Sequence, residues 1–195
     1  MIGFINGKLE DIYGNTLLIN CQGVGFEVLA SQNTITKIGN IGEEVRVYTY
    51  LNVREDEMSL FGFATTEEKS MFLKLTTVSG VGPKTAIGIL SEISIYDLAT
   101  AILSGDTTSI SKIKGIGKKT AERIILELKE KIDNLPLIDK MTSANEMPSS
   151  QEFEYAINVL VSLGLTKYDA TKRIRELARP DDKAEDIIQK VLRSL

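Results

Sequence analysis

The sequence predicts an α+β protein built from a small β-barrel, an all-helical middle part and a small three-helix C-terminal part. Apolar residues alternate with a period of two in the first 64 residues, a helical period begins at Thr65, and residues 134–150 are rich in polar residues and proline without clear periodicity. A chain of 195 residues suits two or three small cores better than a single one.

Residues 1–64 are expected to form the barrel. Apolar side chains alternate over 24–29 and again over 45–49, and strand signals stop at residues 61–63. Five or six short strands separated by glycines are typical of a small closed barrel. The aromatic residues of this region could form a base-stacking platform, but we expect them to be barrel core: Phe4, Phe26, Tyr48, Tyr50, Phe61 and Phe63.

Residues 65–133 carry helical signals. N-terminal capping boxes are predicted at Thr65–Glu68 and at Ser94–Asp97, because a hydroxyl is followed three residues later by a carboxylate. Pro83 suits the first position of another helix, where its missing N–H is no loss. A basic helix is predicted from about residue 118 to 131.

The remainder of the chain is predicted to be a linker and a small helical domain. Residues 134–150 read as a flexible linker, and three short amphipathic helices fit 151–195. Asp182 with Glu185 is the predicted N-terminal box of the last helix. A domain of about 45 residues is marginal alone, so we expect it to dock on a partner.

The composition excludes several classes of active site. The chain has no histidine and only one cysteine, Cys21, which removes Ser-His-Asp and Cys-His catalysis, histidine-ligated metals and disulfides. No cofactor and no metal are expected. No apolar run approaches the ~20 residues that span a bilayer, and the N-terminus lacks a signal peptide. We therefore expect a cytoplasmic protein without a membrane partner.

The charge is unevenly distributed. The formal net charge is −4, which is unusual for a protein that binds nucleic acid. Residues 1–64 carry four basic and eight acidic side chains, whereas residues 65–133 carry ten basic and nine acidic ones. Five of those basic residues crowd into twelve positions: Lys112, Lys114, Lys118, Lys119 and Arg123. The middle part therefore offers a local basic surface on an acidic chain.

A nine-residue motif occurs twice, 35 residues apart. Residues 78–86 (VSGVGPKTA) overlay residues 113–121 (IKGIGKKTA) with five identities and two exchanges of valine for isoleucine. Such repetition indicates a duplicated structural unit. Each copy lies between helical segments and has the form of a helix-hairpin-helix unit.

This motif has the chemistry of a phosphate site. Two glycines one residue apart let the backbone turn sharply and leave N–H groups exposed at the positive end of the following helix. A lysine in that first turn is unfavourable for the helix dipole unless an anion joins it. Two tandem sites can hold both strands of DNA by the backbone, without reading bases. The predicted contacts are Gly80, Gly82, Lys84, Gly115, Gly117, Lys118, Lys119 and Arg123.

Other interpretations of the motif are weaker. A single Gly-x-Gly is often only a tight turn, but two matched copies with lysine at the same offset favour anion binding. Residues 117–120 (GKKT) miss the nucleotide-binding pattern, which requires Gly-Lys followed directly by Ser or Thr. Residues 80–82 lack the third glycine of a dinucleotide fingerprint.

Taken together, these features resemble the RuvA family, the Holliday-junction recognition subunits of the bacterial RuvAB branch-migration machine. The resemblance rests on Met1-Ile2-Gly3 with Gly7, Val53-Arg54-Glu55-Asp56, Leu60-Phe61-Gly62-Phe63, Val78 to Ala86 and Ile113 to Lys129. It implies an OB-fold barrel at 1–64, tandem helix-hairpin-helix units at 65–133 and a mobile domain resembling ubiquitin-associated (UBA) domains at 151–195.

The resemblance also implies partners and an assembly. It implies a homotetramer with one subunit on each arm of a four-way DNA junction, acting in recombination and repair, and it leaves open a second tetramer that completes an octamer. It implies that residues 151–195 bind the RuvB ATPase, that the RuvC resolvase joins a larger complex, and that the chain itself is a non-catalytic subunit.

The family's acidic pin falls on Glu55 and Asp56, which lie with Glu57 in a turn between two strand-like runs. Four copies around a fourfold axis would repel passing phosphates and guide separated strands into their new arms. Without the resemblance, an ordinary solvated turn is the simpler interpretation. Two further alternatives are a Mg²⁺-dependent junction nuclease that uses these acids, and a protein-interaction scaffold built on the C-terminal helices.

Overall fold

A computed structural model describes residues 1–132, 151–165, 167–178 and 182–193 of the chain. The chain divides into two compact units, Met1–Lys129 and Glu130–Leu195. The predicted linker at 134–150 lies outside the described residues, and the proposed domain boundary there stays a prediction.

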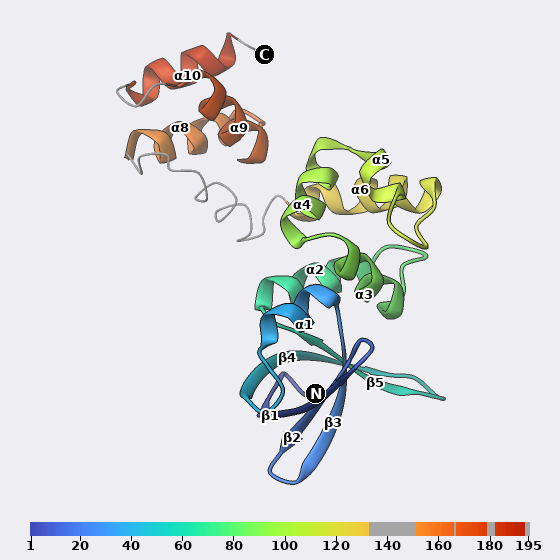
Figure 1. Cartoon of the computed structure of the whole chain (residues 1–195). Coiled ribbons are helices and arrows are strands. Elements are labelled where there is room, and N and C mark those ends of the chain that lie inside the picture. The colour runs from blue at the N-terminus through green and yellow to red at the C-terminus, as the bar shows by residue number, and fades with distance from the viewer. Residues whose placement is uncertain (133–150, 166, 179–181, 194–195) are drawn as a thin grey trace. The chain divides into compact units, whose positions relative to one another are not determined.

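The first unit begins with a closed barrel of five strands in the order β1-β2-β3-β5-β4 (Figure 1). Adjacent strands pair antiparallel except β3 and β5, which are parallel. The predicted barrel is thereby confirmed, with the β4–β5 hairpin projecting beyond it (Figure 1). The strands are β1 (Phe4–Tyr13), β2 (Thr16–Cys21), β3 (Val24–Ala30), β4 (Glu44–Val53) and β5 (Met58–Phe63).

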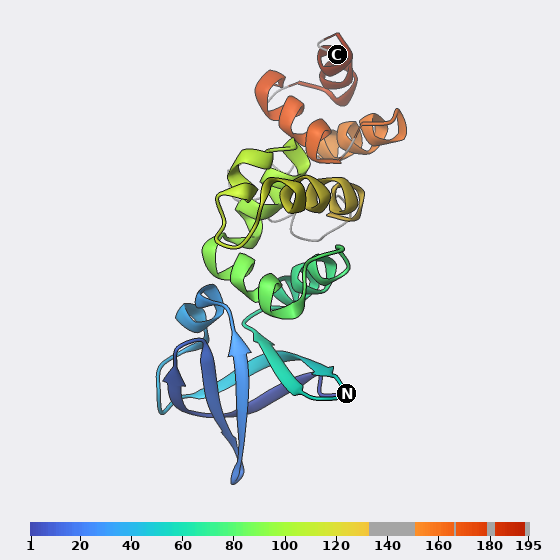
Figure 2. The same cartoon turned by 90° about the vertical axis from the view of Figure 1, so that its right-hand side faces the viewer.

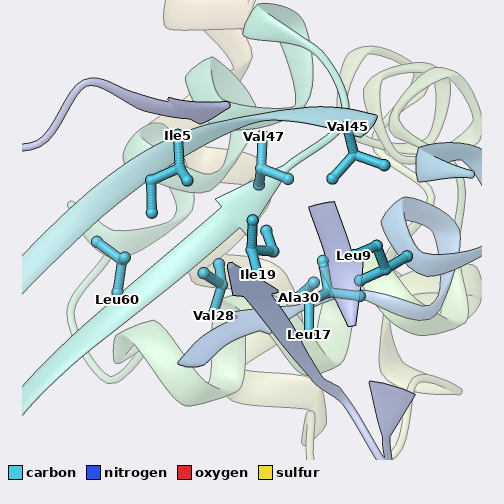
Figure 3. Close-up of a cluster of buried hydrophobic side chains, with 9 residues drawn as sticks. All are labelled: Ile5, Leu9, Leu17, Ile19, Val28, Ala30, Val45, Val47 and Leu60. Carbon is cyan, nitrogen blue, oxygen red and sulfur yellow. The ribbon is translucent and has the colours of Figure 1, made fainter. Parts of the chain in front are cut away.

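The barrel core is aliphatic (Figure 3). Its buried residues come from all five strands and point toward one another: Ile5, Leu9, Leu17, Ile19, Val28, Ala30, Val45, Val47 and Leu60. Gly62 belongs to the same interior, because a Cβ at this position would lie 2.4 Å from Cγ1 of Val28 and 2.6 Å from Cγ1 of Val47. Only glycine lets β5 approach these side chains so closely.

The aromatic residues of the barrel do not all behave as predicted. Phe61 and Phe63 are buried, but they face Phe72 of α2 (Thr66–Thr76), with ring centroids 5.4 and 4.8 Å away. Tyr50 meets the same ring at 5.5 Å. The expectation that Phe4 is core is wrong, because it is 49% exposed and the guanidinium of Arg46 lies 4.1 Å from its ring centroid. Aromatic residues thus join the barrel to α2.

A short helix, α1 (Gln32–Ile38), was not predicted. Ser31 caps it by accepting a hydrogen bond from the N–H of Thr34, but its first turn has no acidic residue, so the sequence lacks the usual second half of a capping box. The helix lies at the end of the barrel nearest α2 and α3 (Figures 1 and 2), and it contacts β4 and α3.

Five helices follow the barrel within residues 65–132, and most begin where the sequence indicates. Thr65 and Ser94 are the caps of α2 and α4, as predicted. Pro83 opens α3 at its first turn. The predicted basic helix is observed as α6, and α5 is a separate short helix. After α2, the helices are α3 (Pro83–Glu92), α4 (Ile95–Ser104), α5 (Thr107–Ser111) and α6 (Lys118–Ile132).

Glu68 differs from the capping-box prediction. Thr65 Oγ1 accepts from its N–H at 3.1 Å, as expected. Its carboxyl group is buried and instead accepts hydrogen bonds from Ser31 Oγ and Thr34 Oγ1, both at 2.6 Å, and from the N–H of Ala64 at 3.2 Å. Glu68 therefore connects α2 to α1.

The described residues from 151 onward form three helices, α8 (Gln151–Ser162), α9 (Lys167–Leu177) and α10 (Ala184–Leu192), around a small core of their own. The predicted capping of the last helix by Asp182 is wrong. Asp182 pairs with Lys190 at 2.5 Å, and Glu152 of α8 accepts from the N–H of Ala184 at 2.7 Å. The first N–H group of α10 is therefore bonded by a carboxylate from another helix, not by a residue of its own cap.

Among the described residues, no single helix is both long and apolar enough to cross a membrane. The helices α3 and α4 reach that length and composition only as a pair, and they are bent by 98° relative to each other.

Candidate nucleic-acid interface

The two copies of the motif have matching backbone geometry. In the first, the N–H of Val81 donates to the carbonyl of Val78, and the N–H of Ala86 to that of Gly82, at 3.0 and 2.9 Å. The same two bonds recur 35 residues later, from Ile116 to Ile113 and from Ala121 to Gly117, both at 3.0 Å. The duplicated hairpin inferred from the sequence is therefore a duplicated structure.

Buried apolar residues anchor both hairpins at equivalent positions. Val78 and Val81 in the first copy, and Ile113 and Ile116 in the second, are each at most 6% exposed. Gly80 and Gly115, which lie between these buried residues, are exposed, and the alanine one turn into each following helix is fully buried. The apolar positions of the motif thus serve folding, which leaves the glycines and lysines for a ligand.

The two glycines of each hairpin have different roles, which the sequence did not distinguish. Gly80 and Gly115 have φ values of 91° and 84°, in the region that side chains rarely adopt. Gly82 has φ −83° and ψ 171°, which any residue can adopt, and Gly117 is not among the residues with positive φ. A Cβ at Gly82 or Gly117 would meet no atom within 4 Å. The expectation that both glycines are needed for the turn is wrong for the second.

Each hairpin exposes donors at the start of a helix. In the described part of the chain, the N–H groups of Gly80, Gly82, Gly115 and Gly117 have no protein acceptor. Gly82 caps α3 without a side-chain bond, and Gly117 occupies the same place before α6. Such a helix end combines free donors with partial positive charge, which favours a bound anion.

The lysines of the two hairpins differ in their surroundings. Lys118 and Lys119 are exposed in the first turn of α6, and no carboxylate of the described residues pairs with either. Lys84, in the first turn of α3, is paired with Glu57: its Nζ lies 3.0 Å from Oε1 and 3.3 Å from Oε2. Sequence reasoning missed this partner, which lies 27 residues earlier in the turn between β4 and β5.

Arg123 connects the two hairpins. Its guanidinium donates to the carbonyl of Ser79, in the first hairpin, at 3.1 Å. The side chain is exposed, so its other N–H groups face solvent. Arg123 was predicted only as a phosphate contact; the structure adds a contact that relates one hairpin to the other.

The predicted acidic pin lies in the turn between β4 and β5. The N–H of Arg54 donates to the carbonyl of Glu57 at 2.8 Å, which closes the turn, and Glu55 and Asp56 are exposed at its tip. Glu57 faces the helices instead: a hydrogen bond from Ser59 Oγ, at 2.6 Å, and the neighbouring Lys84 lower the pKa of its carboxyl group. The three acids therefore divide into two at the tip and one that is paired.

No group of three or more His, Cys, Asp or Glu side chains in the described residues is arranged to hold a metal ion. The nuclease alternative requires such a ligand set at the pin, and the described residues do not supply one.

Comparisons with known proteins match the chain over nearly its whole length. Residues 1–62 match the model of the RuvA N terminal domain, and residues 72–130 match that of a SAM-like helix-hairpin-helix tandem. A protein of Acetivibrio thermocellus is 42% identical over all of this chain and 98% of its own length. Proteins of Chloroherpeton thalassium and Methylococcus capsulatus are 42% and 39% identical over 99% and 100% of this chain, covering 98% of each relative. All three are named Holliday junction branch migration complex subunit RuvA.

Proposed function

Because the chain belongs to the RuvA family, we propose that it binds four-way DNA junctions through the sugar-phosphate backbone and serves branch migration. The observation that carries this proposal is the pair of hairpins with matched backbone bonds, exposed N–H groups and first-turn lysines. Sites of this kind bind phosphate without reading bases. They therefore suit a protein that must accept junctions of any sequence.

The family supplies the assembly that we propose. A homotetramer would place one subunit on each arm of the junction, and a second tetramer on the opposite face would complete an octamer. The separate C-terminal unit supports a role in recruiting the RuvB ATPase, because several large apolar side chains are exposed on it: Tyr155, Val161, Leu163, Leu177 and Leu192. We also propose the RuvC resolvase as a partner of the larger complex.

The proposal is tested by comparing affinities for a four-way junction and for linear duplex of the same sequence, at moderate ionic strength. A mobility-shift titration should give much tighter binding to the junction, and the mass of the complex should give the number of subunits bound. Equal affinity for the two DNAs would contradict the proposed function. Incubation of the junction with Mg²⁺ and the protein also tests the nuclease alternative, which requires specific nicks.

Neutralising the tip of the pin tests its proposed role. Replacing both Glu55 and Asp56 by Gln and Asn should tighten binding to junction and duplex DNA, because negative charge next to the phosphates is removed. Branch migration in the presence of the ATPase should become slower or less directional. Weaker binding to every DNA would contradict a repulsive role of these acids.

A further inference from the structure

The two hairpins are equivalent in backbone but not in charge. Lys119 has no acidic partner among the described residues, whereas Lys84 at the same motif position forms an ion pair with Glu57, at 3.0 Å between Nζ and Oε1. Both side chains of the pair are largely accessible, at 71% and 44% of their surface. A carboxylate thus lies where a DNA phosphate would approach the first hairpin.

The protein holds this carboxylate in place from the barrel side. Ser59 Oγ donates to Oε1 of Glu57 at 2.6 Å, and the turn closes through the bond from Arg54 to the Glu57 carbonyl. A small cavity of about 150 Å³ lies between the β4–β5 hairpin and the start of α3, lined by Asn52, Arg54, Glu57, Gly82 and Lys84 among others. Glu57 and Gly82, the second glycine of the first hairpin, therefore border one space.

We propose that Glu57 is an internal competitor for the anion site of the first hairpin: it holds Lys84 in the free protein and gives it up to a DNA phosphate when a junction binds. This inference rests on the proposed function. The exchange is feasible because an accessible ion pair contributes little to stability, while a phosphate meets both the lysine and the N–H groups at the helix end.

The exchange has a consequence for the pin. Once Lys84 contacts DNA, Glu57 loses its ion-pair partner and keeps only the weaker attraction of Arg54, so the turn that carries Glu55 and Asp56 becomes more negative. Binding of the first hairpin to DNA would therefore strengthen the repulsion between the acidic pin and nearby phosphates. The second hairpin, whose lysines have no acidic partner among the residues that the structure describes, would bind without such an exchange.

A double-mutant cycle tests the competition. Dissociation constants for a four-way junction are measured at one salt concentration for the full chain, for Glu57→Gln, for Lys84→Gln and for the double variant. Glu57→Gln should tighten binding by about two- to fivefold when Lys84 is present, and by clearly less when position 84 is glutamine. Equal effects in the two backgrounds would overturn the proposal. Weaker binding of Glu57→Gln would mean that the carboxylate positions Lys84 for DNA instead of competing with it.

Glu55→Gln is the matched control, because it removes the same charge from the same turn without touching Lys84. Its effect should be the same in both backgrounds, which separates general repulsion from competition for the lysine. If the wild-type chain prefers the junction to the duplex but Glu57→Gln has the same effect with lysine and with glutamine at position 84, the competition is rejected and the proposed function stands. A wild-type chain without that preference would reject the proposed function itself.

A spectroscopic measurement follows the carboxylate directly. In the free protein the pKa of Glu57 is lowered by Ser59 and by Lys84. Carbon-detected NMR titration of the side-chain carboxyl should show this pKa rising when the protein is saturated with junction DNA, because the lysine leaves and phosphates approach. An unchanged value in the complex would show that the ion pair persists and would overturn the exchange.

Discussion

Lys119 is the residue at which the phosphate model is most directly tested, because it is exposed in the first turn of α6 and has no acidic partner in the described chain. Lys119→Gln should weaken binding by a similar factor on junctions of unrelated sequence, and it should lower the slope of log affinity against log salt by about 1. Competition titrations at several salt concentrations measure both.

The control is Lys37→Gln, on α1 and outside both hairpins, which should leave the salt slope unchanged. If Lys119→Gln reduced affinity for one junction sequence far more than for another, backbone recognition would be the wrong model.

Glu68 joins α2 to α1 through a buried carboxyl group. It is 5% exposed, and its carboxyl group accepts from two hydroxyls and one N–H. Glu68→Ala should lower the free energy of unfolding by about 2–4 kcal/mol, since buried donors lose their acceptor. Chemical denaturation monitored by circular dichroism measures this change. Glu67→Ala, one position earlier on the same helix, should cost much less, and equal losses would argue against a special role for Glu68.

Side-chain partners are the part of the candidate site that could not be predicted. Sequence reasoning proposed Lys84 and Arg123 as phosphate contacts from their place in the motif. Their partners in the structure, Glu57 and the Ser79 carbonyl, lie 27 and 44 residues away in the chain. Such contacts depend on how separate elements pack, for which periodicity and spacing give no signal.

At the scale of elements, we expect substitution of the two glycines of the first hairpin to affect different properties, stability for Gly80 and DNA binding for Gly82. Gly80→Ala should destabilise the protein by about 1–2 kcal/mol, because its φ of 91° is strained for any side chain. Gly82→Ala should leave stability nearly unchanged, since a Cβ there meets no atom within 4 Å, but it should weaken junction binding by obstructing the phosphate.

Thermal unfolding and junction affinity of the two variants, measured together, check this separation. Undiminished affinity of Gly82→Ala would remove the second glycine from the interface. The pair Gly115 and Gly117 offers the same comparison at the other hairpin.

Elements with strong local signals were predicted well, and elements held by distant contacts were not. The caps Thr65 and Ser94 and the proline start of α3 follow from local hydrogen bonding, and the structure confirms them. The helix α1 has a threonine-rich sequence of low helix propensity, and it is held by packing against β4 and α3. The start of α10 is satisfied by Glu152 from another helix, which no local pattern could indicate.

At the scale of the whole molecule, we expect junction binding and ATPase-driven branch migration to depend on different units of the chain. Both hairpins lie before residue 123, outside the C-terminal unit. Removing residues 151–195 should therefore leave junction affinity within about twofold of the full chain, which corresponds to about 0.4 kcal/mol of binding free energy. The same truncation should abolish branch migration driven by the RuvB ATPase. Mobility shift and a migration assay on the same preparation measure the two, and lost junction binding would place part of the DNA site in the C-terminal unit.

The helix α2 is held at two places, by the ring of Phe72 against the aromatic rings of the barrel and by the carboxyl of Glu68 against Ser31 and Thr34 of α1, and this has a mechanical consequence. A helix clamped at two places along its length resists both rotation about its axis and hinge bending. If DNA binds the first hairpin as proposed, force that a moving strand exerts there would be transmitted to α1 and the barrel instead of being absorbed by a flexible joint.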